Sequence, residues 1–597
     1  MAQRRSVVPI IIAAIVGVGL ILVVRLLVTG DEDGAGSEGS GECAEIVVAA
    51  SSEKAGLLTE LAGEWNDTGP EVEGACVRAT ITAKSSGAAA AALAEDSWDE
   101  TVAGPRPDVW SPASSSWGAL NRQWRTQADL PDILPQTAQT VAQTPLVIAM
   151  PRPMAEALGW PDEQIGWSDL AQLAQDPAGW GSAGHPEWGA FKLGKTNPNF
   201  STSGLNATIG TYFAATGVSS DLTLQQVQAP QTQEFAAAVE SAAVHYGDTT
   251  LTFLDNMAAA ANQGRGLTYV SAVTVEEKSV WDYNQGNPTG DPATLGDQPP
   301  PSIPLVAVYP KEGTLLSDNP WYVLDATWVD DTQRAGAAQF AAFIQGDDAQ
   351  SRFQEAGFRS FEGTPGDVLN EANGLLADGA ATTLSPPAPD VLQEVLQSWD
   401  DVRKRARVLL VLDVSGSMGQ QSVGGTKLQL AAEATSDAVE EFADDDEVGL
   451  WVFSTERAAD GAPWASLVEI GAAAQTRTPI QQTVASLVPD GGTALYATTR
   501  EAQQQMLASL DTGRVNAIVL LSDGQNEYPP DEDLDSLLDQ LEGESPDTSI
   551  RVFTIGYGEG ADADALTAIA EASAAQYYDA TDPASIDKVL ISVISNF

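Results

Sequence analysis

The segment Asp413-Val414-Ser415-Gly416-Ser417 places one carboxylate and two hydroxyls at alternate positions directly after the apolar run 408–412. A short apolar run bounded by polar residues is typical of a fully buried strand. Carboxylate and hydroxyl oxygens are hard ligands that suit Mg²⁺ or a similar cation. The segment therefore predicts a buried strand with a cation site at its end, although a solvated polar turn would explain the segment taken alone.

Two later segments supply the further ligands that such a site needs. Gly491-Gly492-Thr493 carries a third hydroxyl on a glycine-rich loop, and Ser522-Asp523-Gly524 carries a second carboxylate after the apolar run 517–521. Because these partners follow in order, metal binding is favoured over a polar turn. The D-x-S-x-S…T…D arrangement resembles the metal-ion-dependent adhesion site of the von Willebrand factor A (VWA) family. The resemblance assigns five metal residues: Asp413, Ser415, Ser417, Thr493 and Asp523.

The resemblance to the VWA family also implies how the ion is held. The hydroxyls of Ser415, Ser417 and Thr493 would bind the ion directly, and the two aspartates would act mainly through bound water. Mg²⁺ is the expected cofactor, with Mn²⁺ or Ca²⁺ as alternatives. Mostly neutral ligands leave the ion strongly positive with an open position. The expected partner is therefore a protein or surface ligand that presents an Asp or Glu carboxylate to the metal.

Apolar runs and amphipathic stretches alternate regularly through residues 406–597. Such alternation predicts an α/β domain with a parallel sheet, here a doubly wound, Rossmann-like VWA domain. In such a sheet ligands collect beyond the carboxyl ends of the strands, where Asp413 and Asp523 both lie. The other predicted strands are 448–453, 550–555 and 576–578, and the predicted helices are 428–442, 495–510, 534–541 and 565–570.

The overall charge excludes one class of partner. The 597 residues include 29 Lys and Arg but 83 Asp and Glu, which gives a net charge of −54. Nucleic acid is not an expected partner, because phosphate backbones attract basic surfaces. A salt-adapted surface is the plainer explanation of the charge. With only two histidines, the chain also has little to offer for general acid–base catalysis, so we do not expect an enzyme.

The N-terminus predicts a membrane anchor. Arg4 and Arg5 precede the apolar stretch 7–28, which is interrupted only by Arg25 and has about the length of 20 residues that spans a bilayer. Arginines before the stretch and acidic residues after it place the tail 1–6 in the cytoplasm and the bulk of the chain outside. Residues 29–42 form an acidic Gly/Ser-rich linker. A cleaved signal peptide is the alternative, but no clear Ala-x-Ala site follows.

The chain has two cysteines, Cys43 and Cys76, and each precedes an apolar β-rich run. If the two runs are adjacent parallel strands, both sulfurs lie at the same end of the sheet. An extracytoplasmic location permits a disulfide between them. Two buried free thiols are the alternative.

Residues 43–362 resemble the periplasmic-type solute-binding proteins of ABC transporters, particularly the molybdate-like and sulfate-like receptors. The resemblance implies a type 2 periplasmic binding fold with two lobes, the second formed by an insert at about 146–309. Residues 363–405 would then form a connecting segment and helix. The segments that carry this resemblance are Ala50-Ser51-Ser52, Lys84-Ser85-Ser86-Gly87, Ser111-Pro112-Ala113, Lys195 to Leu205, Tyr309 to Thr314 and Arg352 to Arg359.

The resemblance places a solute site in these loops. A helix that begins at residues 201–204 would offer free N–H groups and hydroxyls to a small polar solute or an oxyanion, although simple helix capping explains the same residues. The nearby Lys54, Lys84 and Lys195 are not expected to point inward. A cleft that binds nothing and acts as a scaffold is also possible. The expected solute residues are Ser52, Ser86, Ser111, Thr202 and Ser203, with Tyr269 closing the second lobe.

Residues 189–196 formally match the phosphate-binding P-loop pattern, but Phe191-Lys192-Leu193 within the match indicates a strand. We therefore do not expect a nucleotide site. The sequence favours a membrane-anchored extracytoplasmic binding protein that docks a partner carboxylate on a metal ion and couples this docking to a solute-binding-like domain. The alternative is a solute receptor of the ABC-transporter type, with the VWA domain as a docking module.

Overall fold

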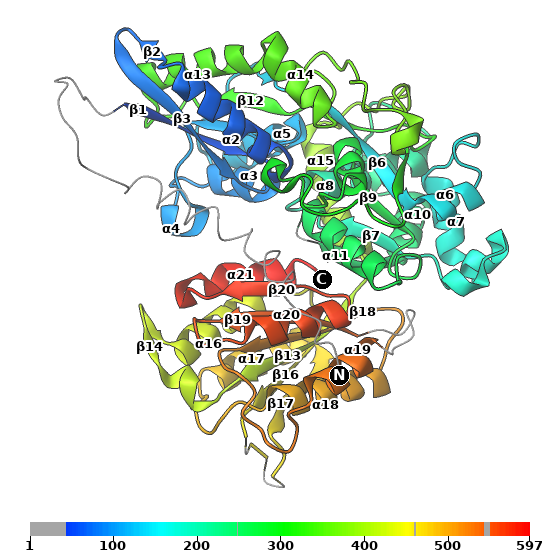
Figure 1. Ribbon diagram of the computed structural model, residues 1–597, viewed down its shortest axis with the longest axis vertical. Helices are drawn as coiled ribbons and strands as arrows, with labels where there is room; N and C mark the ends of the chain where they lie inside the picture. The colour runs from blue at the N-terminus through cyan, green and yellow to red at the C-terminus, as the bar shows by residue number, and fades with distance from the viewer. Residues whose placement is uncertain (1–42, 248, 456, 459–460, 543–549) are drawn as a thin grey trace, which may run out of the picture. The chain divides into compact units, whose positions relative to one another are not determined.

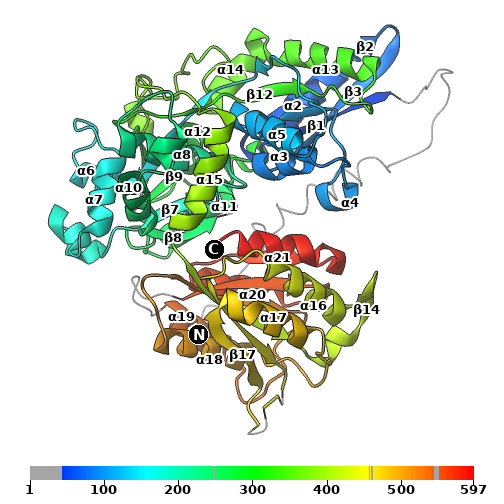
Figure 2. The same ribbon diagram turned by 180° about the vertical axis from the view of Figure 1, so that it is seen from behind.

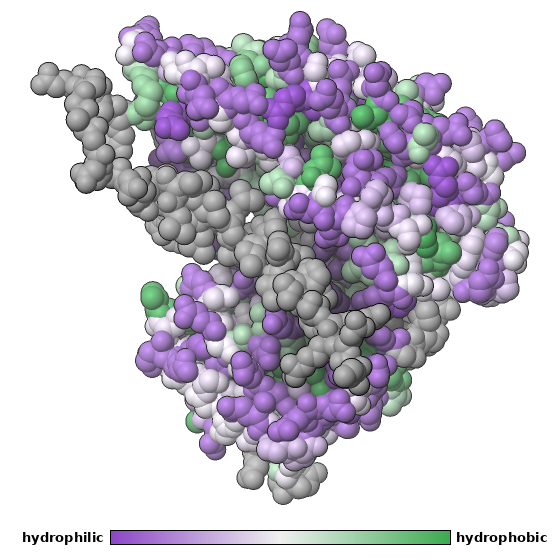
Figure 3. Space-filling view, in the orientation of Figure 1, coloured by the Kyte–Doolittle hydropathy of each residue, from purple (hydrophilic) through white to green (hydrophobic). Residues whose placement is uncertain are grey.

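The computed structural model describes residues 43–597 except 248, 456, 459–460 and 543–549. The predicted membrane helix 7–28, the tail before it and the linker after it all lie outside the described residues. Within the described part of the chain, no helix is both long enough and apolar enough to cross a membrane. Hydrophilic residues dominate the face shown in Figure 3, as the acidic composition leads one to expect.

The first sheet has the strand order β2-β3-β1-β4-β12-β5, and its centre is parallel. Its apolar faces are covered by α2 (Ser52–Asp67) and α13 (Asp331–Ile344) on one side and by α3 (Ser86–Ala94) and α5 (Ser115–Gln127) on the other. The strands are β1 (Ala44–Ala50), β2 (Glu71–Val72), β3 (Ala75–Ala83), β4 (Val109–Ser111), β5 (Gln139–Thr140) and β12 (Pro320–Val323).

The predicted disulfide is present between Cys43 and Cys76. Strands β1 and β3 run parallel, with Ala44 opposite Val77, so the two cysteines precede paired residues at the same end of the sheet. Their Cα atoms are 4.6 Å apart. The prediction of adjacent parallel strands is therefore confirmed together with the bridge.

The second sheet has the order β10-β6-β9-β7-β8, with β11 paired to β6. Helices α7 (Trp167–Gln175), α8 (Thr202–Thr216) and α10 (Pro230–Glu240) pack on one face, while α11 (Thr250–Asn262) and α12 (Glu277–Asn284) pack on the other. The strands are β6 (Thr144–Pro151), β7 (Leu193–Thr196), β8 (Ala243–Gly247), β9 (Ala272–Glu276), β10 (Leu305–Val308) and β11 (Leu316–Ser317). The chain crosses twice between the first two sheets, because β12 returns to the first after the second is complete.

Shorter helices surround these two sheets: α4 (Glu100–Ala103), α6 (Arg152–Ala157), α9 (Leu224–Val227) and α14 (Asp347–Glu355). The connecting helix is α15 (Pro389–Val402), and it packs against α5, α8 and α10. Four apolar residues at helical spacing lie on one face of this helix and are buried: Val391, Leu392, Val395 and Leu396. This helix leads directly into the first strand of the C-terminal domain.

The third sheet has the order β17-β16-β13-β18-β19-β20, in which β17 alone is antiparallel. Figure 2 shows α16 and α17 in front of this sheet, and Figure 1 shows α19 and α20 in front of its other face. The strands are β13 (Ala406–Asp413), β16 (Glu447–Phe453), β17 (Trp464–Ala472), β18 (Val515–Ser522), β19 (Arg551–Tyr557) and β20 (Tyr577–Ala580). The helices are α16 (Lys427–Ala438), α17 (Ala473–Val484), α18 (Leu495–Ala508), α19 (Leu534–Glu542), α20 (Ala563–Ala572) and α21 (Ile586–Ile594).

Helices cover both faces of this parallel sheet, so the predicted doubly wound domain is confirmed. Sequence reasoning missed β17, which contains no continuous apolar run and is only partly buried. Pairing with β16 holds it at the edge of the sheet, and the Trp464 ring stacks on Trp451 with 4.2 Å between centroids. A small two-stranded sheet, β14 (Gln421–Ser422) and β15 (Gly425–Thr426), precedes α16.

Candidate functional site

Three loops meet at the carboxyl edge of the third sheet. Asp413 is the last residue of β13, Asp523 follows β18, and Thr493 lies just before α18. Backbone hydrogen bonds tie the loops together, since the Gly416 N–H donates to the Gly491 carbonyl at 2.8 Å. The parallel register of β13 and β18 is what brings residues 110 positions apart in the chain to one edge.

The structure brings the five predicted metal residues together. The hydroxyl oxygens of Ser415 and Ser417 are 2.9 Å apart, and the Ser417 hydroxyl donates to Asp523 Oδ1 at 2.6 Å. A Cβ atom on Gly524 would lie 2.8 Å from Thr493 Oγ1 and 3.9 Å from Ser417 Oγ. Glycine at this position therefore allows the third hydroxyl to approach the other two.

Asp413 is held by its neighbours on both carboxylate oxygens. Oδ1 accepts a hydrogen bond from the Ser415 N–H at 2.8 Å, and Oδ2 accepts one from the Ser522 hydroxyl at 2.7 Å. The side chain is fully buried, and this burial raises the pKa of Asp413 to about 6, with the nearby Asp523 adding to the shift. A buried carboxylate without a paired side-chain cation is stabilised in its ionised form by a bound cation. The donor set of two carboxylates and three hydroxyls therefore fits a hard divalent ion.

Lys427 is a charged residue at this site that sequence reasoning missed. Its Nζ lies 2.9 Å from Asp523 Oδ2, and its side chain is only 9% exposed. It is the first residue of α16, where Thr426 caps the helix. The sequence did contain a signal for this residue, because Lys427 is the only lysine between Lys404 and Lys588 and it follows the metal-site segment 413–417 closely.

The hydroxyls predicted to bind a solute are engaged mainly with other protein groups. Ser86 Oγ accepts from the Ala113 N–H at 3.0 Å, and Thr202 Oγ1 accepts from the Trp117 indole N–H at 2.9 Å. Ser203 Oγ lies within 3.0 Å of hydroxyls on Thr196, Ser201 and Thr250. The bond from Trp117 to Thr202 joins α5 of the first lobe to the start of α8 of the second.

The backbone reinforces this contact between the two lobes. The Gly87 N–H donates to the Phe200 carbonyl at 2.9 Å. A Cβ atom on Gly87 would lie 2.2 Å from the Asn199 carbonyl oxygen, so only glycine allows so close an approach. The facing loops are therefore in direct contact where the resemblance placed a solute.

The remaining three solute candidates have different surroundings. Ser111 is fully buried, and its hydroxyl has no hydrogen-bond partner among the described residues. Ser52 is the first residue of α2. Tyr269 is buried against Phe253, and the Arg551 guanidinium of β19 lies 5.3 Å from its ring centroid. Tyr269 thus packs towards the C-terminal domain, whereas Thr202 bonds to Trp117 of the other lobe and Ser86 to Ala113 of its own.

Lys54 and Lys195 were not expected to point inward, yet both side chains are fully buried. Lys54 Nζ donates to Ser51 Oγ at 2.8 Å, to the Pro112 carbonyl and to Asn319 Oδ1, and burial lowers its pKa to about 7. Lys195 forms an ion pair with buried Glu240. It lies in strand β7, whereas the P-loop pattern would place it at the start of a helix.

Glu276 is a further buried charged residue that sequence reasoning missed. It ends β9, it is 1% exposed, and neither carboxylate oxygen makes a well-formed hydrogen bond within the described chain. Burial raises its pKa to about 8, and the charge of Glu53 acts in the same direction, while Lys54 opposes them. Glu276 and Lys54 therefore interact across the seam between the lobes.

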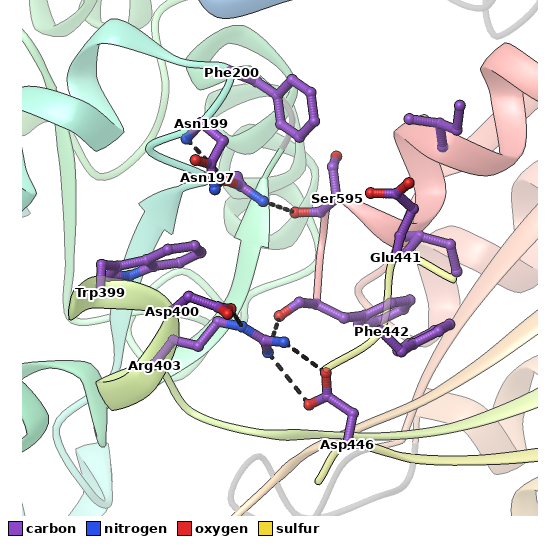
Figure 4. A pocket seen from close by; sticks show the side chains of 13 residues that line it. Asn197, Asn199, Phe200, Trp399, Asp400, Arg403, Glu441, Phe442, Asp446 and Ser595 are labelled. Carbon is purple, nitrogen blue, oxygen red and sulfur yellow. Dashed lines mark hydrogen bonds and ion pairs between the residues drawn. The ribbon is translucent and has the colours of Figure 1, made fainter. Parts of the chain in front are cut away.

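The last residues of the C-terminal domain contact the second sheet (Figure 4). The Tyr246 N–H donates to the Asn596 carbonyl at 2.8 Å, and Asn197 Nδ2 donates to the Ser595 carbonyl at 3.1 Å. Arg403 bridges Asp446 and the Phe597 carbonyl. A cavity of about 170 Å³ lies among these residues. The loop 197–200 thus contacts the C-terminal domain at Asn197 and the first lobe at Phe200.

Two family models match the chain. The model for bacterial extracellular solute-binding proteins matches residues 46–359. The model for the von Willebrand factor type A domain matches residues 408–590. The first range corresponds to the first two sheets and the second range to the third sheet.

The most similar curated relatives include two proteins of Mycobacterium tuberculosis, from strains CDC 1551 and H37Rv, both named as uncharacterized. Each is 23% identical over 497 residues, which covers 82% of this chain and 67% of the relative. Among solved structures, a von Willebrand factor type A protein from Catenulispora acidiphila is 21% identical, with a TM-score of 0.28, over 32% of this chain and 42% of that one. The periplasmic binding protein AfuA from Actinobacillus pleuropneumoniae is 15% identical, with a TM-score of 0.37, over 61% and 99%.

Proposed function

We propose, from the premise that this chain belongs to the bacterial extracellular solute-binding proteins and carries a VWA domain, that it is an extracytoplasmic binding protein. In this proposal the VWA domain holds Mg²⁺ at Asp413, Ser415, Ser417, Thr493 and Asp523 and docks a carboxylate of a partner protein on that ion. The solute-binding domain serves as the body to which the VWA domain is attached. No catalytic role is proposed.

One observation carries the proposal: five hard oxygen ligands from three loops converge at one sheet edge, around a fully buried Asp413. Three of the five ligands are neutral hydroxyls, so they do not cancel the charge of a divalent ion. When bound, the ion would supply a Lewis-acidic position for an oxygen ligand. Ser415, Ser417 and Thr493 would orient it, and the aspartates would hold it in place. An external carboxylate is the natural group to complete such a site.

The test is calorimetric titration of Mg²⁺ into the wild-type protein and into Asp413→Asn. We expect the substitution to weaken binding by about 100-fold or more, since loss of outer groups alone costs 10- to 100-fold at metal sites. Asp444→Asn is the matched control, because Asp444 is an exposed acid that pairs with Arg477. Equal Mg²⁺ affinity in the wild type and Asp413→Asn would refute the proposal.

Anchoring of the chain to the cell membrane is proposed from the sequence pattern of residues 1–42 alone. A variant that lacks residues 1–30 should move from the membrane fraction to the soluble fraction, and protease added to intact cells should degrade the wild-type chain. Retention of the shortened protein in the membrane fraction would contradict the anchor.

A second candidate function, reception of a small polar solute for a transporter, is favoured by two buried polar groups of the solute-binding domain that lack hydrogen-bond partners among the described residues. The Ser111 hydroxyl and the Glu276 carboxylate are buried without well-formed hydrogen bonds among the described residues. Groups of this kind are costly to bury unless a ligand or water satisfies them. Thermal-shift screening of the whole chain against oxyanions, sugars and amino acids tests this function. A ligand that raises the melting temperature of the wild type but not of Ser111→Ala would support solute binding. If no compound raised the melting temperature, the solute-binding domain would act only as a scaffold.

A further inference from the structure

We infer that Lys427 sets the charge of the proposed metal site so that a bound divalent ion keeps a net positive charge and accepts a carboxylate from outside. This inference rests on the proposed function, because it names the residue that tunes the same site. It concerns the balance between two affinities: that of the protein for the ion, and that of the loaded ion for its partner.

The position of the ammonium is well defined. Asp523 directs Oδ1 to the Ser417 hydroxyl and Oδ2 to Lys427 Nζ, at 2.6 and 2.9 Å. Asp523 is fully buried and Lys427 nearly so, and an ion pair shielded from water keeps most of its electrostatic effect. Lys427 therefore modulates the aspartate that is expected to face the ion.

The surrounding chain is shaped around this lysine. A capping box between Thr426 and Gln429 fixes the start of α16, and the Tyr557 hydroxyl donates to the Lys427 carbonyl at 3.0 Å. Gly558 adopts a φ of +77°, and a Cβ atom there would lie 2.8 Å from both Cε and Nζ of Lys427. The glycine gives the ammonium its space, so Lys427 is held beside the site by its own backbone and by its neighbours.

The sum of the formal charges at the site determines how many external carboxylates are needed to balance the bound ion. With both carboxylates ionised, Asp413 and Asp523 contribute −2 and Lys427 contributes +1, so the formal charge of the site is −1 before it binds an ion and +1 after it binds a divalent one. One external carboxylate brings the sum to zero. Without Lys427, the two aspartates would neutralise the ion by themselves. Asp490 and Glu527 lie nearby on exposed loops, where water and salt screen their charges.

The test replaces Lys427 by Met and, as a second variant, by Gln. Two quantities are measured at one pH: the Mg²⁺ affinity by calorimetry, and the affinity of acetate for the Mn²⁺-loaded protein by the relaxation rate of water protons. We expect Mg²⁺ to bind about tenfold more tightly to both variants, because a repelling charge is lost. We expect acetate to bind the loaded variants several-fold more weakly. Damage to the fold would weaken the binding of both Mg²⁺ and acetate. Tighter Mg²⁺ binding together with weaker acetate binding therefore identifies an effect of the Lys427 charge.

Arg477→Gln is the matched control, since it removes one positive charge near the other end of α16, where Arg477 contacts the carbonyls of Val439 and Phe442. It should change neither affinity. Unchanged or weaker Mg²⁺ binding in both Lys427 variants would overturn the inference while leaving the proposed function intact. If the wild type itself bound no Mg²⁺, the proposed function would fail first.

Discussion

The metal loops of the VWA domain and the cleft of the solute-binding domain are built alike but differ in how their charges are compensated. Both gather hydroxyls and carboxylates beyond the carboxyl ends of strands. Between the lobes, the charge of Lys54 acts against the pKa shift of Glu276 and the Trp117 indole N–H donates to Thr202, so the protein supplies partners for part of the polar groups there. At the metal loops, Asp413 is buried with hydroxyl and amide partners only. Lys427 compensates only Asp523, so one of the two buried carboxylates of the metal loops has no cation of the described chain beside it.

Removal of one member of a compensated pair should have the largest effect. Lys195→Met would leave Glu240 buried and charged, so we expect a loss of about 3–5 kcal/mol in the free energy of unfolding. Chemical denaturation measures this loss. Lys311→Met is the control, because the Lys311–Asp169 pair is about one-third exposed and should contribute at most about 1 kcal/mol. Similar losses in both variants would show that burial does not set the cost of an unpaired charge here.

The direct contact between the lobes can be broken at Gly87. Gly87→Ala would force a Cβ atom to within 2.2 Å of the Asn199 carbonyl and 2.8 Å of Trp117, with an expected loss of up to about 3 kcal/mol. Gly63→Ala in α2 meets nothing within 4 Å and should stabilise the helix by up to about 1 kcal/mol. Thermal unfolding distinguishes the two. Mg²⁺ affinity should be unchanged in both, and a change in Gly87→Ala would couple the cleft to the metal site.

The free energy of unfolding measured over a range of pH tests whether Glu276 is neutral in the folded protein. Its pKa of about 8 lies above the usual value of 4.5, so the folded state keeps a proton that the unfolded state releases between these values. Stability should therefore fall as pH rises from 5 to 7, and Glu276→Gln should remove this fall, which we put at about 2 kcal/mol. Glu355→Gln is the control, because Glu355 is exposed. A stability difference between wild type and Glu276→Gln that stays constant with pH would contradict the buried neutral carboxyl.

The sequence predicted the parts of the molecule in which pattern and spacing report on structure. Apolar runs revealed the parallel strands of the third sheet, and the resemblance to the VWA family grouped Asp413, Ser415 and Ser417 with Thr493 and Asp523. The two cysteines were paired correctly because each lies at the beginning of one of two adjacent parallel strands. These features are local, or they follow from the rule that parallel strands end at one edge.

The features that escaped prediction depend on contacts between distant segments. Lys427 reaches Asp523 across 96 positions, and Glu276 faces Lys54 only because two lobes meet. Strand β17 has no apolar signature and is stabilised by pairing with β16. The hydrophobic periodicity of the sequence gives no information about contacts between distant segments. Tyr269 shows the same limit, since its contact with Arg551 belongs to another domain.

Crystals soaked in Mn²⁺ test the central claim most directly. The account predicts an anomalous difference peak about 2.2 Å from the hydroxyl oxygens of Ser415, Ser417 and Thr493, with a carboxylate or water at an open position. The same soak of Asp413→Asn crystals should show no peak there. The absence of a peak at these three hydroxyls in the wild type, or Mn²⁺ bound only at exposed acidic loops, would contradict the account.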